Sequence, residues 1–279
     1  MIGTSRFSAR SKRTGVLLLA ILLLFLFGFP FIFVLITSFK SQMGYMKDLW
    51  GFPREIFLGN YTKVLSLTFL TYFLNSLLIS SLSVGIGILV ASLASYAFAR
   101  VRFRLSKPLF MIFLIGMMIP AHTTLIPIYQ LINRIGLYNS KFALLGPYIS
   151  FTMPISVFII TQFFREVPEE ILDAATIDGS GPLRTFWNIM MPLSTPAIAT
   201  VGIYNFLQTW NEFIFALVLV TKTSEKTLPL GIRDFYGVES VNIPAVLTAV
   251  LVGSLPVMLF YFFAQEQVIN GLSAGAVKE

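Results

Sequence analysis

The sequence predicts an all-α integral membrane protein with six transmembrane helices, and three observations support this fold class. Hydrophobic residues make up 56% of the 279 residues, charged residues make up 12%, and the mean hydropathy is +0.81. A soluble domain has about 25% charged residues. The apolar residues fall in six runs that are each long enough to cross a bilayer, and basic residues gather in short segments between them.

Each run reaches the roughly 20 residues that a helix needs to cross the hydrocarbon core. The predicted spans are Val16–Ile36, Tyr72–Phe98, Leu109–Leu131, Phe142–Phe164, Ala197–Val220 and Pro244–Ala264. The first follows a basic segment, but it is too long for the apolar region of a signal peptide and lacks a small-residue cleavage site, so we expect it to be retained. The second contains small residues four apart, Ser83, Gly87, Ala91 and Ser95, which predict close packing against another helix.

The distribution of basic residues predicts the orientation of the chain. Residues 1–15 and 99–108 each contain four Lys or Arg residues, whereas residues 133–141 contain only Arg134 and Lys141. The positive-inside rule therefore places both termini in the cytoplasm. The predicted organisation is a cytoplasmic segment 1–15, a transmembrane domain 16–264 and a cytoplasmic tail 265–279. The hydrophilic stretch 166–192 also falls on the cytoplasmic side.

Several classes of site are excluded by composition. The chain has no cysteine and one histidine, His122, so it holds no disulfide, thiolate centre or multi-histidine metal site. It contains no GxxxxGK[ST] motif for nucleotide phosphates. The net charge of +7 fits basic cytoplasmic loops of a membrane protein rather than nucleic-acid binding. We therefore predict no catalytic residue, no metal and no cofactor.

The cytoplasmic stretch Glu166–Pro192 carries five of the thirteen acidic residues. Pro168 suits the first position of a short helix, and the acids Glu169 and Glu170 suit its positively polarised start. Gly179 is the expected end of this helix. A second short helix is predicted from Pro182 to Pro192, with Leu183, Phe186 and Met190 on one side. Helices this short are marginal in water, so they need a surface to dock against.

Polar residues segregate to one side of the fifth predicted span. At 100° per residue, they fall within an arc of about 160°; these residues are Tyr204, Asn205, Gln208, Thr209, Asn211 and Glu212. Trp210 points to the apolar side. Glu212 lies roughly 20 Å along the span from Ile198, still inside the bilayer, where an ionisable group costs about 2.5–3.5 kcal/mol and marks a functional site. Two interpretations stay open: Glu212 lines a polar pathway, or it pairs with a neighbouring helix and only fixes assembly.

Several motifs then identify a family. The cytoplasmic stretch reads DAATIDG at Asp173–Gly179 and ends IMMP at Ile189–Pro192; other stretches are NSLL from Asn75, SYAFARVRF at Ser95–Phe103, IPIYQLINRIGLYNS at Ile126–Ser140, WNEFIFAL at Trp210–Leu217 and NGLSAG from Asn270. With them the chain resembles the inner-membrane permease subunits of bacterial ATP-binding-cassette importers, in the maltose-type carbohydrate branch, over roughly residues 70–275. The family motif begins Glu-Ala-Ala, whereas this chain has Asp173, whose shorter side chain weakens the inference of a salt bridge to the ATPase.

The resemblance implies a type I importer permease fold with six transmembrane helices and a cytoplasmic coupling helix seated in a cleft of a separate ATPase. The implied ATPase-coupling residues are Glu169, Glu170, Asp173, Ala174, Ala175, Asp178, Gly179 and Pro192, and the expected substrate-pathway residues are Tyr204, Asn205, Gln208, Asn211 and Glu212. The implied partners are a second permease, two ATPase subunits, an extracytoplasmic solute-binding protein and a sugar or oligosaccharide, in the bacterial inner membrane.

Three alternatives to an ATP-driven importer for a sugar or oligosaccharide follow from the same sequence. The first is a permease for an acidic or phosphorylated sugar derivative. The second is a stand-alone secondary carrier or channel, which six spans, the lack of an evident inverted repeat and nearly absent intramembrane charge disfavour. The third is a structural membrane scaffold.

Overall fold

The computed structural model describes residues 4–236 and 241–276, with side chains described for residues 15–236, 241–263 and 265. The predicted cytoplasmic segment 1–15 and tail 265–279 therefore lie partly outside the described residues. The chain forms two compact units, Met1–Ser66 with Asp234–Gly253, and Leu67–Arg233 with Ser254–Glu279. The predicted transmembrane domain 16–264 contributes to both. In the described residues all regular structure is helical, apart from one isolated bridge between Tyr236 and Val241.

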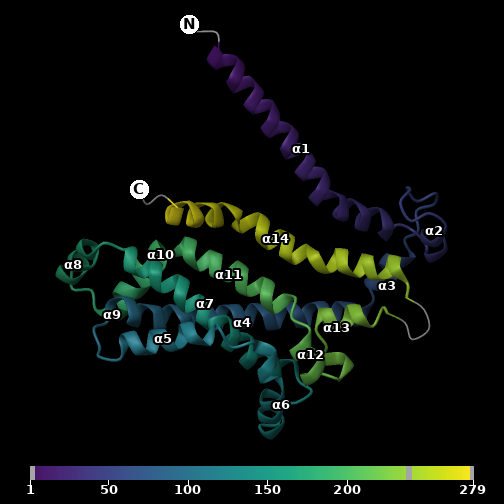
Figure 1. Ribbon diagram of the computed structural model, residues 1–279. Helices are drawn as coiled ribbons and strands as arrows, with labels where there is room; N and C mark the ends of the chain where they lie inside the picture. The colour runs from purple at the N-terminus through teal and green to yellow at the C-terminus, as the bar shows by residue number, and fades with distance from the viewer. Residues whose placement is uncertain (1–3, 237–240, 277–279) are drawn as a thin grey trace. The chain divides into compact units, whose positions relative to one another are not determined.

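The first unit consists of α1 (Thr4–Ser38), α2 (Gln42–Lys47), α3 (Gly59–Val64) and the beginning of α14 (Ile243–Ala276) (Figure 1). Asn60 holds it together, because its buried amide donates to the carbonyls of Ser38 at 2.9 Å and Lys40 at 2.8 Å. The Lys40 ammonium in turn donates to the carbonyl of Asp48 at 2.8 Å. These bonds satisfy backbone groups where α1 ends and the chain turns.

The second unit contains the remaining helices. They are α4 (Leu67–Arg100), α5 (Ser106–Gly116), η1 (Ala121–Thr124), α6 (Leu125–Arg134), η2 (Lys141–Leu144), α7 (Leu145–Glu166), α8 (Glu169–Ile177), α9 (Pro182–Thr185), a π-helical turn (Phe186–Met190), α10 (Met191–Leu193), α11 (Thr195–Trp210), α12 (Ile214–Leu219), η4 (Thr223–Glu225), α13 (Leu228–Arg233) and the later part of α14. The helices α4, α7 and α11 pack side by side at its centre (Figure 1).

The contact between α4 and α7 is the most extensive in this unit. The small residues predicted to admit another helix, from Ser83 to Ser95, are buried along it. A Cβ atom on Gly87 would lie 3.8 Å from Thr152 Oγ1 of α7, and Ser95 Oγ donates to the Val157 carbonyl at 3.2 Å. The predicted close approach is therefore confirmed, and α7 is the partner helix.

Four helices in the described part of the chain are long and apolar enough to cross a membrane, at Gly15–Ser38, Leu67–Arg100, Lys141–Glu166 and Ile243–Phe263. They contain the first, second and fourth predicted spans, and the sixth, Pro244–Ala264, lies within α14. The third and fifth predicted spans are not continuous helices. The length criterion alone therefore yields four spans, or five if a bent helix pair is counted as one.

The third predicted span, Leu109–Leu131, is bent. The helices Ser106–Gly116 and Ala121–Arg134 meet at 93°. Pro120 lies at this break with φ −64° and ψ 120°. Proline favours a break because it lacks the N–H that a continuous helix would use and disfavours the helical conformation of the residue before it. The fifth, Ala197–Val220, divides into α11 and α12 around Asn211–Phe213.

We predict that Gly87→Leu destabilises the α4–α7 contact by about 1–3 kcal/mol, because the larger side chain overpacks the surface against Thr152. The matched control is Gly85→Leu on the same helix, where an added Cβ would have no neighbour within 4 Å. The melting temperature of the purified chain in detergent should fall for the first substitution and stay close to the original for the second. Equal melting temperatures for both variants would contradict a tight contact at Gly87.

Candidate functional site

The helix α8, Glu169–Ile177, begins and ends close to where the sequence predicts. Pro168 is the residue before the helix rather than its first residue, with φ −58° and ψ 141°. Glu169 and Glu170 occupy the first turn, where the helix dipole stabilises negative charge. Asp178 is the C-cap residue, and Gly179 follows in the left-handed region at φ 76°.

Two backbone hydrogen bonds close the end of α8. Gly179 N–H donates to the Thr176 carbonyl at 3.0 Å, and Ser180 N–H donates to the Ala175 carbonyl at 2.9 Å. This is a Schellman motif, which requires a left-handed residue after the helix, and glycine adopts that conformation without steric strain. The predicted end of α8 at Gly179 is confirmed.

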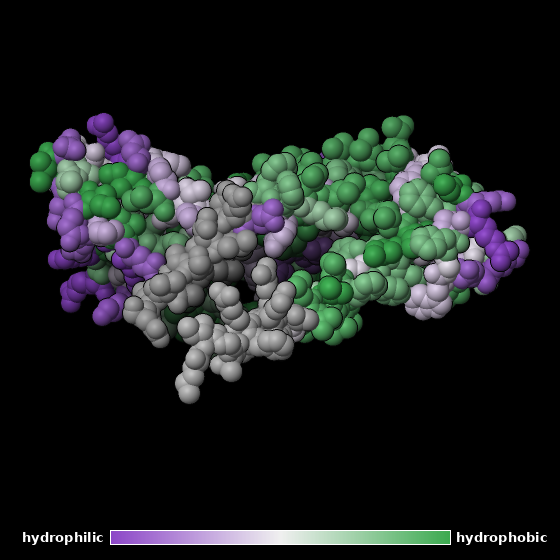
Figure 2. Space-filling view, turned by 90° about the horizontal axis from the view of Figure 1, so that it is seen from above, coloured by the Kyte–Doolittle hydropathy of each residue, from purple (hydrophilic) through white to green (hydrophobic). Residues whose placement is uncertain are grey.

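The two sides of α8 have different surroundings. Ala175 is buried, and Leu172 packs against a core cluster that contains Phe164, Phe186 and Met190. Ile177 points away from the core and is 87% exposed. Glu169, Glu170, Asp173, Ala174 and Asp178 are also exposed. The helix thus presents an acidic surface with two large apolar side chains, Ile177 and the 41%-exposed Ile171. In Figure 2 hydrophilic residues gather at the left end, where Figure 1 places α8 and α9.

The second short segment differs from its prediction. It begins at Pro182, but it consists of α9, the π-helical turn and α10, and its helical residues continue to Leu193, one residue beyond the predicted end at Pro192. Phe186 and Met190 are fully buried as a pair, whereas Leu183 is 71% exposed. The prediction that Leu183 lies on the same side of one helix as Phe186 and Met190 is therefore wrong. Leu183 belongs to α9, whereas Phe186 and Met190 belong to the π-helical turn that follows. Pro192 lies in α10 and is exposed.

Arg100 fixes the base of α8 to the end of α4. Its guanidinium donates to the carbonyls of Phe164 and Val167, which lie on either side of the end of α7. A cation at a helix C-terminus is also favoured by the helix dipole. The position of the segment that carries α8 is thus set by α4 as well as by α7.

A cleft of about 1180 Å³ lies beside α8. One wall is the turn from α4 to α5, and the other includes Glu169, Leu172, Asp173 and Thr176 of α8. Figure 1 shows α8 and α9 at the same end of the unit as that turn. Two of the eight predicted coupling residues, Glu169 and Asp173, therefore line one cavity.

A second polar site lies where α11 gives way to α12. α11 ends at Trp210, and Asn211 Nδ2 donates to the Leu207 carbonyl at 2.9 Å. Glu212 accepts hydrogen bonds from the N–H groups of Phe215 at 2.7 Å and Ala216 at 3.2 Å, so it caps the start of α12. These bonds satisfy backbone groups that the break would otherwise leave without partners inside a membrane.

Tyr148 of α7 completes this site. Its hydroxyl donates to Glu212 Oε2 at 2.9 Å, and its ring is buried in the same core cluster as Phe215. Glu212 thus bonds both a neighbouring helix and the break itself, and its side chain is only partly buried. The contact with a neighbouring helix matches one of the two interpretations from sequence without removing the other.

The structure divides the other residues of the predicted polar arc. Tyr204, Gln208 and Asn211 are exposed. Asn205 is fully buried, and its Nδ2 donates to Ser156 Oγ of α7 at 2.9 Å, while Thr209 is also buried. Trp210 is buried and stacks on Phe206 with ring centroids 5.4 Å apart, as its position on the apolar side predicts. The arc therefore comprises an exposed set and a set that packs between helices.

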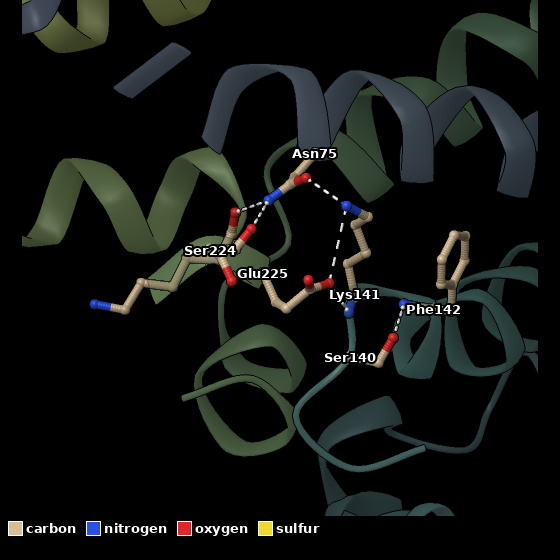
Figure 3. Close-up of polar contacts among 7 residues, drawn as sticks. Asn75, Ser140, Lys141, Phe142, Ser224 and Glu225 are labelled. Carbon is tan, nitrogen blue, oxygen red and sulfur yellow. Dashed lines mark hydrogen bonds and ion pairs between the residues drawn. The ribbon is translucent and has the colours of Figure 1, made fainter. Parts of the chain in front are cut away.

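A third polar cluster was not predicted (Figure 3). Lys141 Nζ donates to Asn75 Oδ1 at 2.9 Å and lies 3.9 Å from Glu225 Oε2. Asn75 Nδ2 donates to the carbonyls of Ser224 at 2.9 Å and Lys226 at 3.0 Å. The cluster ties the chain after α12 to α4 and to the start of η2. The available sequence signal was Asn75, a polar residue near the start of an apolar run.

The arrangement separates two polar ends of one unit. Asn75 and Arg100 lie near opposite ends of α4, about 37 Å apart at 1.5 Å per residue, which exceeds the hydrocarbon thickness of ~30 Å. No group of three or more potential metal ligands occurs among the residues that were described.

Comparison with known proteins adds the following. Residues 83–269 match the family model described as the binding-protein-dependent transport system inner membrane component. Over 246 residues the chain is 45% identical to ORF2 of Caldicellulosiruptor sp. (strain Rt8B.4), which is named for an ABC transporter permease, covering 88% of this chain and 90% of that protein. It is 35% identical to the trehalose/maltose transport system permease protein of Thermococcus litoralis, over 79% of this chain and 81% of that protein. It is 32% identical to the melibiose/raffinose/stachyose import permease protein of Bacillus subtilis, over 97% of this chain and 99% of that protein.

A solved structure shares the fold. It is a chain from a bacterial ABC transporter involved in the import of the acidic polysaccharide alginate, with a TM-score of 0.77 at 19% identity, covering 95% of this chain and 98% of that one. At this identity the likeness concerns the fold alone.

We predict that Gly179→Ala loosens α8, because an alanine in the left-handed region costs about 1–2 kcal/mol. The control is Gly181→Ala, since Gly181 has φ −73° and an added Cβ there would meet nothing within 4 Å. Amide hydrogen exchange of residues 172–180 should accelerate about tenfold in the first variant and stay unchanged in the second. Unchanged exchange in both would contradict the closing motif.

Proposed function

This chain belongs to the family of binding-protein-dependent transport system inner membrane components, and from that premise we propose that it forms half of the translocation pathway of an ATP-driven importer for a neutral sugar or oligosaccharide. The family match confirms the resemblance to importer permeases that the motif at Asp173–Gly179 indicated. The chain is a membrane component of an ABC transporter with the all-helical permease fold. In this proposal it hydrolyses nothing itself.

The observation that carries the proposal is the surface of α8. A nine-residue helix is too short to be stable alone, yet α8 exposes Ile171 and Ile177 together with three acidic side chains, and Asp178 at its C-cap adds a fourth. A short amphipathic helix of this kind suits a groove on another protein. We assign that groove to an ATP-hydrolysing subunit, with Glu169, Glu170, Asp173, Ala174, Ala175, Asp178, Gly179 and Pro192 forming or supporting the contact.

The basic residues support a cytoplasmic position for α8. The turn 99–108, which borders the same cleft, contains four Lys or Arg residues. Under the positive-inside rule this end of the unit faces the cytoplasm, with both termini on that side. The cluster around Lys141 then faces outward, where a solute-binding protein would dock. A second permease and two ATPase subunits would complete the assembly.

The exposed polar residues at the end of α11 are the proposed pathway contacts. Tyr204, Gln208 and Asn211 offer donors and acceptors that suit hydroxyl-rich ligands, and Glu212 lies at the break that follows. Broken helices line the substrate sites of many transporters. Asn205 supports this surface from the buried side through Ser156.

Two relatives support a neutral carbohydrate, since their names refer to trehalose, maltose, melibiose, raffinose and stachyose. An acidic sugar is the alternative. Residues 195–219 contain Glu212 and no Lys or Arg, so an anionic ligand would meet a carboxylate without a compensating cation on these two helices. This charge pattern favours neutral substrates.

We predict that Gln208→Leu lowers sugar uptake by on the order of tenfold without lowering the melting temperature, because it removes one exposed hydrogen-bonding group. Glu212→Gln should lower uptake similarly. The control is Leu207→Ala, which changes an exposed apolar residue adjacent to Gln208, removes no hydrogen-bonding group and should preserve uptake. Uptake is measured in proteoliposomes that contain the binding protein, both permeases and the ATPase.

The same assay separates the alternatives. Uptake should stop without ATP and persist when an ionophore removes the ion gradients. Uptake that follows the ion gradient and ignores ATP would instead identify a secondary carrier. Full uptake by both the Gln208 and Glu212 variants would remove these residues from the pathway while leaving the ATP dependence intact.

A further inference from the structure

We propose that the cleft between the α4–α5 turn and α8 binds the headgroup of an anionic phospholipid, whose acyl chains lie along the exposed face of α5. The proposal uses the membrane location of the chain but not the identity of the transported sugar. Phosphatidylglycerol is the lipid that fits the chemistry of the cleft best, for the reasons given next.

The cleft carries an excess of positive charge. Its lining includes five cationic residues, Arg100, Arg102, Arg104, Lys107 and Arg165, and two acidic ones, Glu169 and Asp173. Among the residues that the structure describes, the recorded ion pair is elsewhere, between Lys141 and Glu225. Arg102, Arg104 and Lys107 are exposed and repel one another at the mouth of the cleft. A phosphate would relieve this repulsion.

The start of α5 adds a second attraction for phosphate. α5 begins at Ser106, and Leu105 before it supplies no side-chain cap. Its first turn contains Lys107 and no acid. Of the first N–H groups, that of Ser106 donates to the Phe103 carbonyl at 3.2 Å, that of Leu109 donates to the Leu105 carbonyl at 3.0 Å, and Pro108 has none. The attraction therefore comes from the Lys107 N–H and the positive end of the helix dipole, which favour an anion beside the same cations.

The apolar surface next to these groups suits acyl chains. Lys107, Met111 and Ile115 are four residues apart and form one row on α5. Met111 is 56% exposed, Ile112 is 61% exposed and Ile115 is 54% exposed. The opposite side packs inward, with Phe110 beneath the Arg165 guanidinium at 5.0 Å. This row thus places the Lys107 ammonium at the start of α5 and exposed apolar side chains further along it. An inner-leaflet phospholipid needs the same order, with a cation for its headgroup and an apolar surface for its acyl chains.

The acidic wall narrows the choice of headgroup. Glu169 and Asp173 accept hydrogen bonds and would repel a second phosphate or a carboxylate. A headgroup that combines one phosphate with hydroxyl groups satisfies both walls, since the phosphate faces the cations and the hydroxyls donate to the carboxylates. Phosphatidylglycerol has this composition, whereas phosphatidylcholine adds a permanent cation to an already cationic site.

The test uses the purified importer complex in detergent, titrated with phosphatidylglycerol and observed by native mass spectrometry. The test variant combines Arg102→Gln, Arg104→Gln and Lys107→Gln. We expect its affinity for phosphatidylglycerol to fall by on the order of 100-fold, since each of the three cations contributes to attraction of an anionic lipid. The control variant combines Lys63→Gln, Arg134→Gln and Lys222→Gln, which removes three exposed cations outside the cleft and should leave the affinity unchanged. Phosphatidylcholine should bind both variants equally.

Three results would overturn the proposal. The first is equal retention of phosphatidylglycerol by the test and control variants. The second is displacement of the lipid by millimolar inorganic phosphate, which would identify a free-phosphate site. The third is a test variant that keeps the lipid but loses the ATPase subunits, which would assign the cleft to a protein partner. If the triple variant does not fold, Lys107→Gln alone should weaken binding about fivefold, and unchanged binding would count against the proposal.

Discussion

The packing of α7 against α4 is the constraint on which the rest of the second unit depends. Gly87 and the buried serines of α4 let the two backbones approach, and this sets the position of α7 along its whole length. α7 carries Tyr148, which holds Glu212 at the α11–α12 break, and it ends at the carbonyls that Arg100 binds. One helix therefore connects the polar break with the base of α8, about 24 Å apart at 1.5 Å per residue.

This connection gives the proposed function a physical route. A force on α8 would reach α7 directly and α4 through Arg100, because both hold the segment before α8. α7 also holds Glu212 through Tyr148 and Asn205 through Ser156, so a rigid-body movement of α7 with α4 would change the surroundings of the proposed pathway residues. The cluster of Asn75, Lys141 and Glu225 holds the other end of α4 to the chain after α12.

Sequence patterns predicted the features that depend on neighbouring residues. Length and hydropathy located four long helices, and the Pro168–Gly179 signals located α8. The breaks at 117–120 and 211–213 were missed, although Pro120 lies at the first of them. At the second, Glu212 bonds the backbone at the start of α12, and a hydropathy run does not reveal this contact. The helical wheel grouped Asn205 with Gln208 because it contains no information on neighbouring helices, and α7 buries one of them. The Lys141 cluster joins residues far apart in sequence, which periodicity does not reveal.

The most direct test of the central claim uses the absence of cysteine from the chain. A single cysteine introduced by Ile177→Cys would carry a photo-crosslinker at the exposed position of α8, and Ile126→Cys, 70% exposed on α6, would serve as the matched position elsewhere. In the intact importer, illumination should attach the chain to an ATP-hydrolysing subunit from position 177 and not from position 126. The absence of an ATPase adduct at position 177 would contradict the assignment of α8 as the coupling helix.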